Sequence, residues 1–192
     1  MIKRFSFKLR AVELVKFFKA FPKPYHRVSK VVVEQVSKAF TLRLFDAADL
    51  DRVIYINRTC LPENYPPDFF LMHHREHPKA FLVAEMGGEV VGYSMSRVEH
   101  GFSNFRMAFV KKGHVISIAV LPHARRIGIG TSLLTKTLEA LKDYGASEVY
   151  LEVRVSNEPA INLYRKLGFA VVRRLVGYYV DGEDAYLMAR RL

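Results

Sequence analysis

The feature that most constrains the fold of this chain is a turn with two arginines and two glycines, Arg125 to Gly130 (RRIGIG). It joins an apolar run, HVISIAVL, to a run with apolar residues at helical spacing, TSLLTKTLEALKDYG. A turn of this kind exposes backbone N–H groups at a helix N-terminus, where the helix dipole adds partial positive charge. It therefore predicts an anion site between a strand and a helix.

The segments on either side of this turn alternate between strand and helix patterns. Two apolar runs that meet at Gly87-Gly88 predict a β-hairpin, and a short helix is predicted to begin at Asn157 and end at Gly168. Strand patterns occupy residues 41–45, 80–86, 89–99, 114–121, 148–155, 169–176 and 184–192. Helix patterns occupy residues 46–60, 68–76, 128–144 and 157–168. This order predicts a mixed α/β domain.

The composition favours a globular protein inside the cell. No uninterrupted apolar run approaches the ~20 residues that span a bilayer, so no membrane helix is expected. Near the N-terminus, Glu13, Lys16 and Lys19 interrupt the apolar stretch that a secretory signal needs. Cys60 is the single cysteine, which fits a reducing compartment and a place in the core. We expect a cytoplasmic protein.

Positive charge is concentrated at the N-terminal end of the chain. The net charge is +11, and residues 1–40 carry ten Lys and Arg against two Asp and Glu, a net +8. We therefore expect a basic N-terminal extension over residues 1–40, followed by one domain over residues 41–192. The positive charge of this extension predicts salt-sensitive contact with the ribosome, RNA or an acidic surface. The equal alternative is that the extension is a solvated appendage.

The two glycines of the turn do not complete a familiar phosphate loop. Leu133 stands where the dinucleotide fingerprint has its third glycine, and the chain contains no Gly-Lys-Ser/Thr for a P-loop. From the glycines alone, a helix start with glycines for close packing stays an open alternative.

A longer pattern surrounds the turn. Arg125, Gly128 and Gly130 form Arg-x-x-Gly-x-Gly between a strand and a helix, and YLEVRVSNEPAINLYRKLGF follows. This combination resembles the GNAT acetyltransferase superfamily. Over about residues 40–192, the chain is similar to the catalytic subunits of NatA-type protein N-alpha-acetyltransferases, especially archaeal forms. Four pieces carry this similarity, namely LPENYP, GHVISIAVL, LEVRVSN and YYVDGEDAYLM. The resemblance implies a mixed, mostly antiparallel sheet with splayed parallel central strands, flanked by helices.

The resemblance also implies acetyl-CoA as the cofactor and no metal. The pyrophosphate of acetyl-CoA would meet the turn, and its pantetheine arm would pair with main-chain groups of the splayed strands. An N–H near Ile118 or Ala119 would stabilise charge on the thioester oxygen. The implied cofactor residues are Ile118, Ala119, Val120, Arg125, Arg126, Gly128, Ile129, Gly130, Thr131, Asn157 and Tyr164.

Three residues are implied to be catalytic. His114 and Glu152 would be the base pair for an α-amino group, whose pKa near ~7.7–8.0 makes the demand on a base light. Tyr164 matches the family tyrosine that gives a proton to the departing CoA thiolate. Considered without the resemblance, His114 is an edge-strand histidine, Glu152 an exposed carboxylate and Tyr164 a core aromatic residue.

Two loops, LPENY and GYYVDGED, are implied to bind the acceptor, a nascent or mature protein N-terminus. Leu61, Pro62 and Tyr65 would wall a pocket for the first side chain. Tyr178 and Tyr179 would form hydrogen bonds with the substrate backbone.

The implied reaction is direct transfer of acetyl to the α-amino group in a ternary complex. Glu63 is implied to favour Ser, Ala or Thr as the first residue, and the archaeal resemblance adds Met starts. Considered alone, Glu63 is a solvated residue in a Pro-flanked turn. Two alternatives stay open, namely a GNAT enzyme for lysine side chains or small amines and a ribosome- or RNA-binding module.

A histidine-rich segment resembles a metal patch. His73, His74, Glu76 and His77 lie close in the chain, but their spacing matches no zinc-protease motif. We expect exposed histidines and no metal.

Overall fold

A single sheet determines the architecture of the domain. In the computed structural model, which describes residues 40–192, seven strands follow the order β1-β2-β3-β4-β5-β7-β6. They are β1 (Thr41–Leu44), β2 (Phe81–Met86), β3 (Glu89–Phe102), β4 (Phe109–Val120), β5 (Glu148–Arg154), β6 (Ala170–Leu175) and β7 (Ala185–Arg191). All neighbouring strands are antiparallel except β4 and β5. The expected mixed, mostly antiparallel sheet is confirmed.

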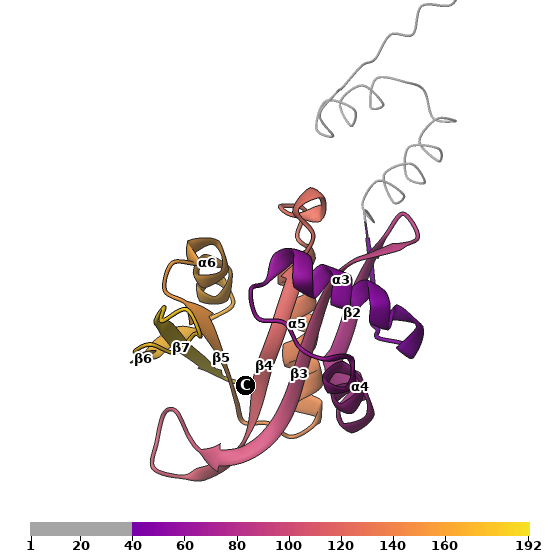
Figure 1. The fold of residues 1–192 in the computed structure, drawn as a ribbon. Helices are drawn as coiled ribbons and strands as arrows, with labels where there is room; N and C mark the ends of the chain where they lie inside the picture. The colour runs from indigo at the N-terminus through magenta and orange to yellow at the C-terminus, as the bar shows by residue number, and fades with distance from the viewer. Residues whose placement is uncertain (1–39) are drawn as a thin grey trace, which may run out of the picture. The chain divides into compact units, whose positions relative to one another are not determined.

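Within residues 40–192, four α-helices pack against this sheet. They are α3 (Leu50–Cys60), α4 (Pro67–Glu76), α5 (Ile129–Asp143) and α6 (Glu158–Lys166). Figure 1 shows α3 and α4 on one face of the central strands and α5 on the other. The predicted boundaries of α6 are confirmed: the Asn157 side chain accepts a hydrogen bond from the N–H of Ala160, and Gly168 follows the helix with φ 82°. None of the helices within residues 40–192 is long and apolar enough to cross a membrane.

The predicted basic extension is not part of this description. Residues 1–39 lie outside the described residues, and so do the expectations about ribosome or RNA contact that depend on them.

The parallel strands β4 and β5 separate early. Their register runs from Lys112 opposite Glu148 to His114 opposite Tyr150, whereas β4 continues to Val120 and β5 to Arg154. The expected splay is confirmed. Because backbone groups alternate in direction along a strand, part of the β4 backbone beyond His114 faces the gap instead of a neighbouring strand.

The hairpin of β3 and β4 is longer than the sequence predicts. A strand was expected to start at His114, but β4 begins at Phe109. The carboxylate of Glu148, which is buried, accepts hydrogen bonds from the Ser103 hydroxyl at 2.6 Å and from the Asn104 backbone at 2.7 Å. This contact between distant segments holds the loop that joins the two strands, so local periodicity does not reveal it.

The expectation of exposed histidines is wrong for His73, and it overstates the exposure of His74 and His77. His73 is fully buried on α4, and its Nδ1 lies 2.8 Å from the Phe69 carbonyl oxygen. His74 and His77 are half-buried, beside Phe45 and Tyr144. His73 and His74 lie on α4, whereas His77 directly follows this helix. Burial lowers the pKa of both His73 and His77.

Cys60 is only partly a core residue. It packs against the core cluster on α3, but it also lines the cleft described below, where its Sγ lies 3.5 Å from the Val120 carbonyl oxygen.

Candidate active site

A cleft of about 850 Å³ opens where β4 and β5 separate. Its walls are the loop after α3, the N-terminal part of α6 and the loop between β6 and β7. The structure brings together eleven of the predicted site residues along it. These are Leu61, Pro62, Glu63, Tyr65, His114, Ile118, Glu152, Asn157, Tyr164, Tyr178 and Tyr179.

His114 and Glu152 form a hydrogen-bonded pair in this cleft. The Nε2–H of His114 donates to a carboxylate oxygen of Glu152 at 2.8 Å, and both side chains are about 15% exposed. Within residues 40–192 the buried Nδ1 of His114 has no hydrogen-bond partner. The pair can therefore take up one proton, because the carboxylate of Glu152 stabilises the resulting imidazolium of His114.

Alternation along β5 explains why polar residues face the cleft. Val149, Leu151 and Val153 are buried in the core, whereas Glu152 and Arg154 lie on the opposite face of the strand. Once the buried face of β5 is known, the alternation of a strand therefore places Glu152 and Arg154 on its other face.

Arg154 connects the two loops that border the cleft. Its guanidinium donates to Glu63 at 2.5 Å, to Asp181 at 2.7 Å and to Glu183 at 2.8 Å. The guanidinium carbon also lies 4.0 Å from the centre of the Tyr179 ring. Glu63 is therefore held in an ion pair, and the interpretation of it as merely solvated is wrong.

Sequence reasoning missed Arg154 as a site residue. The signal available was its alternation with Glu152 on one strand face, but no local pattern indicates three carboxylates from segments far apart in the chain.

Burial raises the pKa values of three tyrosines that line the cleft. It raises the pKa of Tyr164 to about 12, and it is the main reason that the pKa values of Tyr65 and Tyr178 are also raised. The nearby carboxylates of Glu63 and Glu152 raise the pKa values of Tyr65 and Tyr178 further. All three hydroxyl groups thus keep their protons at neutral pH and can donate hydrogen bonds.

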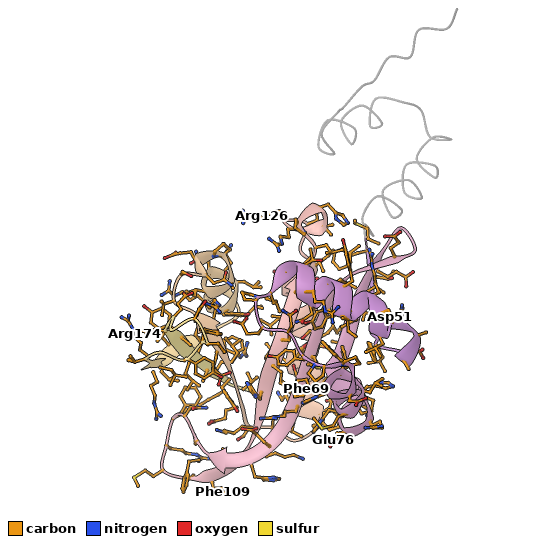
Figure 2. The ribbon with its side chains drawn as sticks, in the orientation of Figure 1. Asp51, Phe69, Glu76, Phe109, Arg126 and Arg174 are labelled. Atoms are coloured by element: carbon orange, nitrogen blue, oxygen red, sulfur yellow. The ribbon has the colours of Figure 1, made fainter. Side chains whose placement is uncertain are left out.

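The turn before α5 has the backbone conformation of an anion site. Arg126 has φ 69° and Gly128 has φ 97°, and Gly128 is the N-cap of α5 without a side-chain cap. The first N–H groups of the helix, those of Ile129, Gly130 and Thr131, have no intrahelical acceptor. Consecutive N–H groups in such a turn form a concave site for phosphate oxygens. Figure 2 shows Arg126 at the opposite end of the sheet from Phe109.

The remaining predicted cofactor residues lie outside the cleft lining. The side chain of Ala119 is buried in the core, so only its backbone is available to a ligand. The N–H of Leu121 donates to Val91 on β3, so by alternation the polar groups of Val120 face away from β3. The Val120 carbonyl accepts a hydrogen bond from Nε of Arg125 at 2.8 Å, which fixes Arg125 against the end of β4.

Comparison with known proteins agrees with this geometry. A model of the acetyltransferase (GNAT) family matches residues 50–169. The N-alpha-acetyltransferase of Sulfurisphaera tokodaii is 59% identical over 158 residues, which are 81% of this chain and 95% of that protein. The crystal structure of Ard1 from Thermoplasma volcanium is 33% identical with a TM-score of 0.68, covering 80% of this chain and 98% of that chain.

A third similar protein was solved with a ligand that joins both substrates. Naa20 of Chaetomium thermophilum, in complex with a bisubstrate analogue, is 32% identical with a TM-score of 0.70 and covers 79% of this chain and 86% of that chain. The chain described here belongs to the GNAT acetyltransferase family. It is an acetyl-CoA-dependent N-alpha-acetyltransferase.

Proposed function

We propose that this enzyme acetylates protein N-termini by direct attack of the α-amino group, with His114 and Glu152 as the base. The observation that carries the proposal is the position of this hydrogen-bonded pair, in a cleft that begins where β4 and β5 stop pairing. A cofactor arm that occupies the gap between the strands would therefore end beside the pair.

The residues present fit acetyl-CoA. The N–H groups at the start of α5 would bind its pyrophosphate, because they have no side-chain cap and the turn before them has positive φ at Arg126 and Gly128. The backbone of Ile118 and Val120 and the side chain of Asn157 would hold the pantetheine arm. When bound, acetyl-CoA supplies an activated thioester whose carbonyl carbon is the electrophile.

The charge of the cleft suits a protein N-terminus. Among the described residues, its lining contains three carboxylates, Glu63, Glu152 and Asp181, and one guanidinium, Arg154. An α-amino group with a pKa near ~7.7–8.0 arrives mostly as a cation, which this excess of negative charge attracts. The pair of His114 and Glu152 then takes the proton, directly or through a water molecule.

Tyr164 would donate a proton to the departing thiolate. Because burial raises its pKa to about 12, the hydroxyl is protonated at every pH below that value and loses its proton only above it. We expect Tyr164→Phe to lower kcat about tenfold, since a thiolate is a good leaving group and general-acid help is modest. The factor should be the same at pH 7 and at pH 9. A defect that disappears between these two values in a pH–rate profile would contradict the assignment.

Specificity for the first residue is proposed to depend on Glu63. Its carboxylate is held by Arg154 beside Tyr65, and with Leu61 and Pro62 it narrows the space for the first side chain. We therefore propose that N-termini beginning with Ser, Ala or Thr are preferred and that Met starts are tolerated.

The test is CoA release with peptides that begin Ser, Ala, Met-Leu or Met-Glu and with a peptide whose N-terminus is blocked and which contains Lys. Turnover is expected only on free N-termini. Glu63→Ala is expected to change the ratio of kcat/KM between Ser and Met-Leu peptides about tenfold, because it widens the pocket and frees Arg154. Glu89→Ala, at an exposed ion pair with Arg52, is the matched control and should leave the ratio unchanged. Turnover on the blocked peptide alone would instead support an enzyme for lysine side chains.

A further inference from the structure

An aromatic ring lies directly against the imidazole of His114. Tyr150 on β5 is the register partner of His114 in the last pair of β4 and β5. The two ring centres are 4.4 Å apart and the ring planes differ by 8°, so the rings are stacked. Tyr150 is not among the residues that line the cleft, whereas His114, on which it stacks, is one of them.

The Tyr150 ring is itself fixed from two sides. Its hydroxyl donates to a carboxylate oxygen of Glu99 at 2.6 Å, and the other oxygen of Glu99 accepts from Arg97 at 3.0 Å. Nζ of Lys112 lies 4.6 Å from the ring centre. Burial, followed by the bond to Glu99, raises the pKa of Tyr150, so the hydroxyl remains a donor. The hydrogen bond thus holds the hydroxyl end of the ring in place, and the ammonium of Lys112 lies over the ring face.

We propose that Tyr150 is a positioning residue that holds the imidazole of His114 in one orientation. The proposal rests on the proposed role of His114 as part of the base. The imidazole can rotate about its last torsion angle, and Nε2–H meets Glu152 only when the ring lies in one plane. Stacking on Tyr150 favours that plane, and the bond to Glu152 then fixes the tautomer in which Nδ1 carries no proton.

The first test reads the tautomer of His114 without using activity. Long-range ¹H–¹⁵N spectra of the full chain distinguish Nε2–H from Nδ1–H, and the resonances lost in His114→Gln identify His114. We expect wild type and Tyr150→Phe to show the Nε2–H tautomer alone, and Tyr150→Met to show both tautomers. A single Nε2–H tautomer in folded Tyr150→Met overturns the proposal.

The second test separates positioning from loss of the fold. We expect Tyr150→Met to lower kcat by about tenfold to 100-fold, a part of the general-base contribution, with KM for acetyl-CoA and peptide within about threefold of wild type. Tyr150→Phe, which keeps the stack, should recover most of kcat. Tyr55→Met, at a half-exposed tyrosine on α3, is the matched control and should change neither kcat nor the spectrum.

The outcomes distinguish this proposal from the proposed function. If His114→Gln keeps the wild-type kcat, His114 is not the base, yet the spectra still decide whether Tyr150 orients its ring. If Tyr150→Met does not fold, Tyr150→Val decides in its place, because a β-branched residue favours a strand and also removes the ring. A second tautomer in Tyr150→Val supports the proposal, and a single tautomer overturns it.

Discussion

Glu152→Gln is expected to lower kcat by about 10²–10³-fold while KM for the peptide stays within about threefold, as for the loss of a general base. The substitution keeps the size of the side chain and an oxygen that can accept the hydrogen bond from His114 Nε2–H, now 2.8 Å long. It removes the negative charge that would stabilise the imidazolium of His114. Steady-state kinetics with a peptide that begins with Ser measures the effect.

The double variant His114→Gln/Glu152→Gln tests whether the two residues act together. Because they form one hydrogen-bonded unit, the double variant should be hardly slower than the slower single variant. Glu139→Gln, at an exposed ion pair with Lys136 on α5, is the matched control and should have wild-type kinetics. If the two single effects multiply in the double variant, or if Glu152→Gln keeps kcat within about threefold, the assignment of the base is wrong.

Arg154→Gln is expected to lower kcat/KM for peptides by about 100-fold, mainly through KM, because removal of one partner from a partly buried ion-pair network is costly. Glu63, Asp181 and Glu183 would then face one another without the cation that holds them, and the two loops that border the cleft would separate. The Kd for acetyl-CoA should stay within about threefold, since the anion turn lies elsewhere in the fold.

Steady-state kinetics measures kcat/KM for peptides, and calorimetric titration measures the Kd for acetyl-CoA. Arg154→Lys should recover only part of the loss, because an ammonium group cannot donate to three carboxylates in the fork geometry of a guanidinium. Arg52→Gln, at an exposed pair with Glu89 away from the cleft, is the control. Equal loss of peptide and acetyl-CoA binding in Arg154→Gln would show that Arg154 supports the whole fold instead of the peptide loops.

Much of the secondary structure was predictable because its causes are local. The hairpin at Gly87-Gly88 needs positive φ at both glycines, and they have φ 62° and 83°. The boundaries of α6 follow from Asn157 and Gly168 for similar reasons. The length of the β3–β4 hairpin was not predictable, because Glu148 from a distant strand holds its loop.

By itself, the amino-acid sequence determined the strand–turn–helix pattern and the order of strands and helices. These features depend on glycine conformation, helix capping and periodicity, which act over a few residues. Eleven residues of the cleft were implied by the resemblance to a known family and not by local pattern. The tertiary structure alone decided that Arg154 joins Glu63 to Asp181 and Glu183, and that Tyr150 stacks on His114. Those contacts join residues between 27 and 91 positions apart in the chain, and the register of the sheet and the placement of the two loops bring them together.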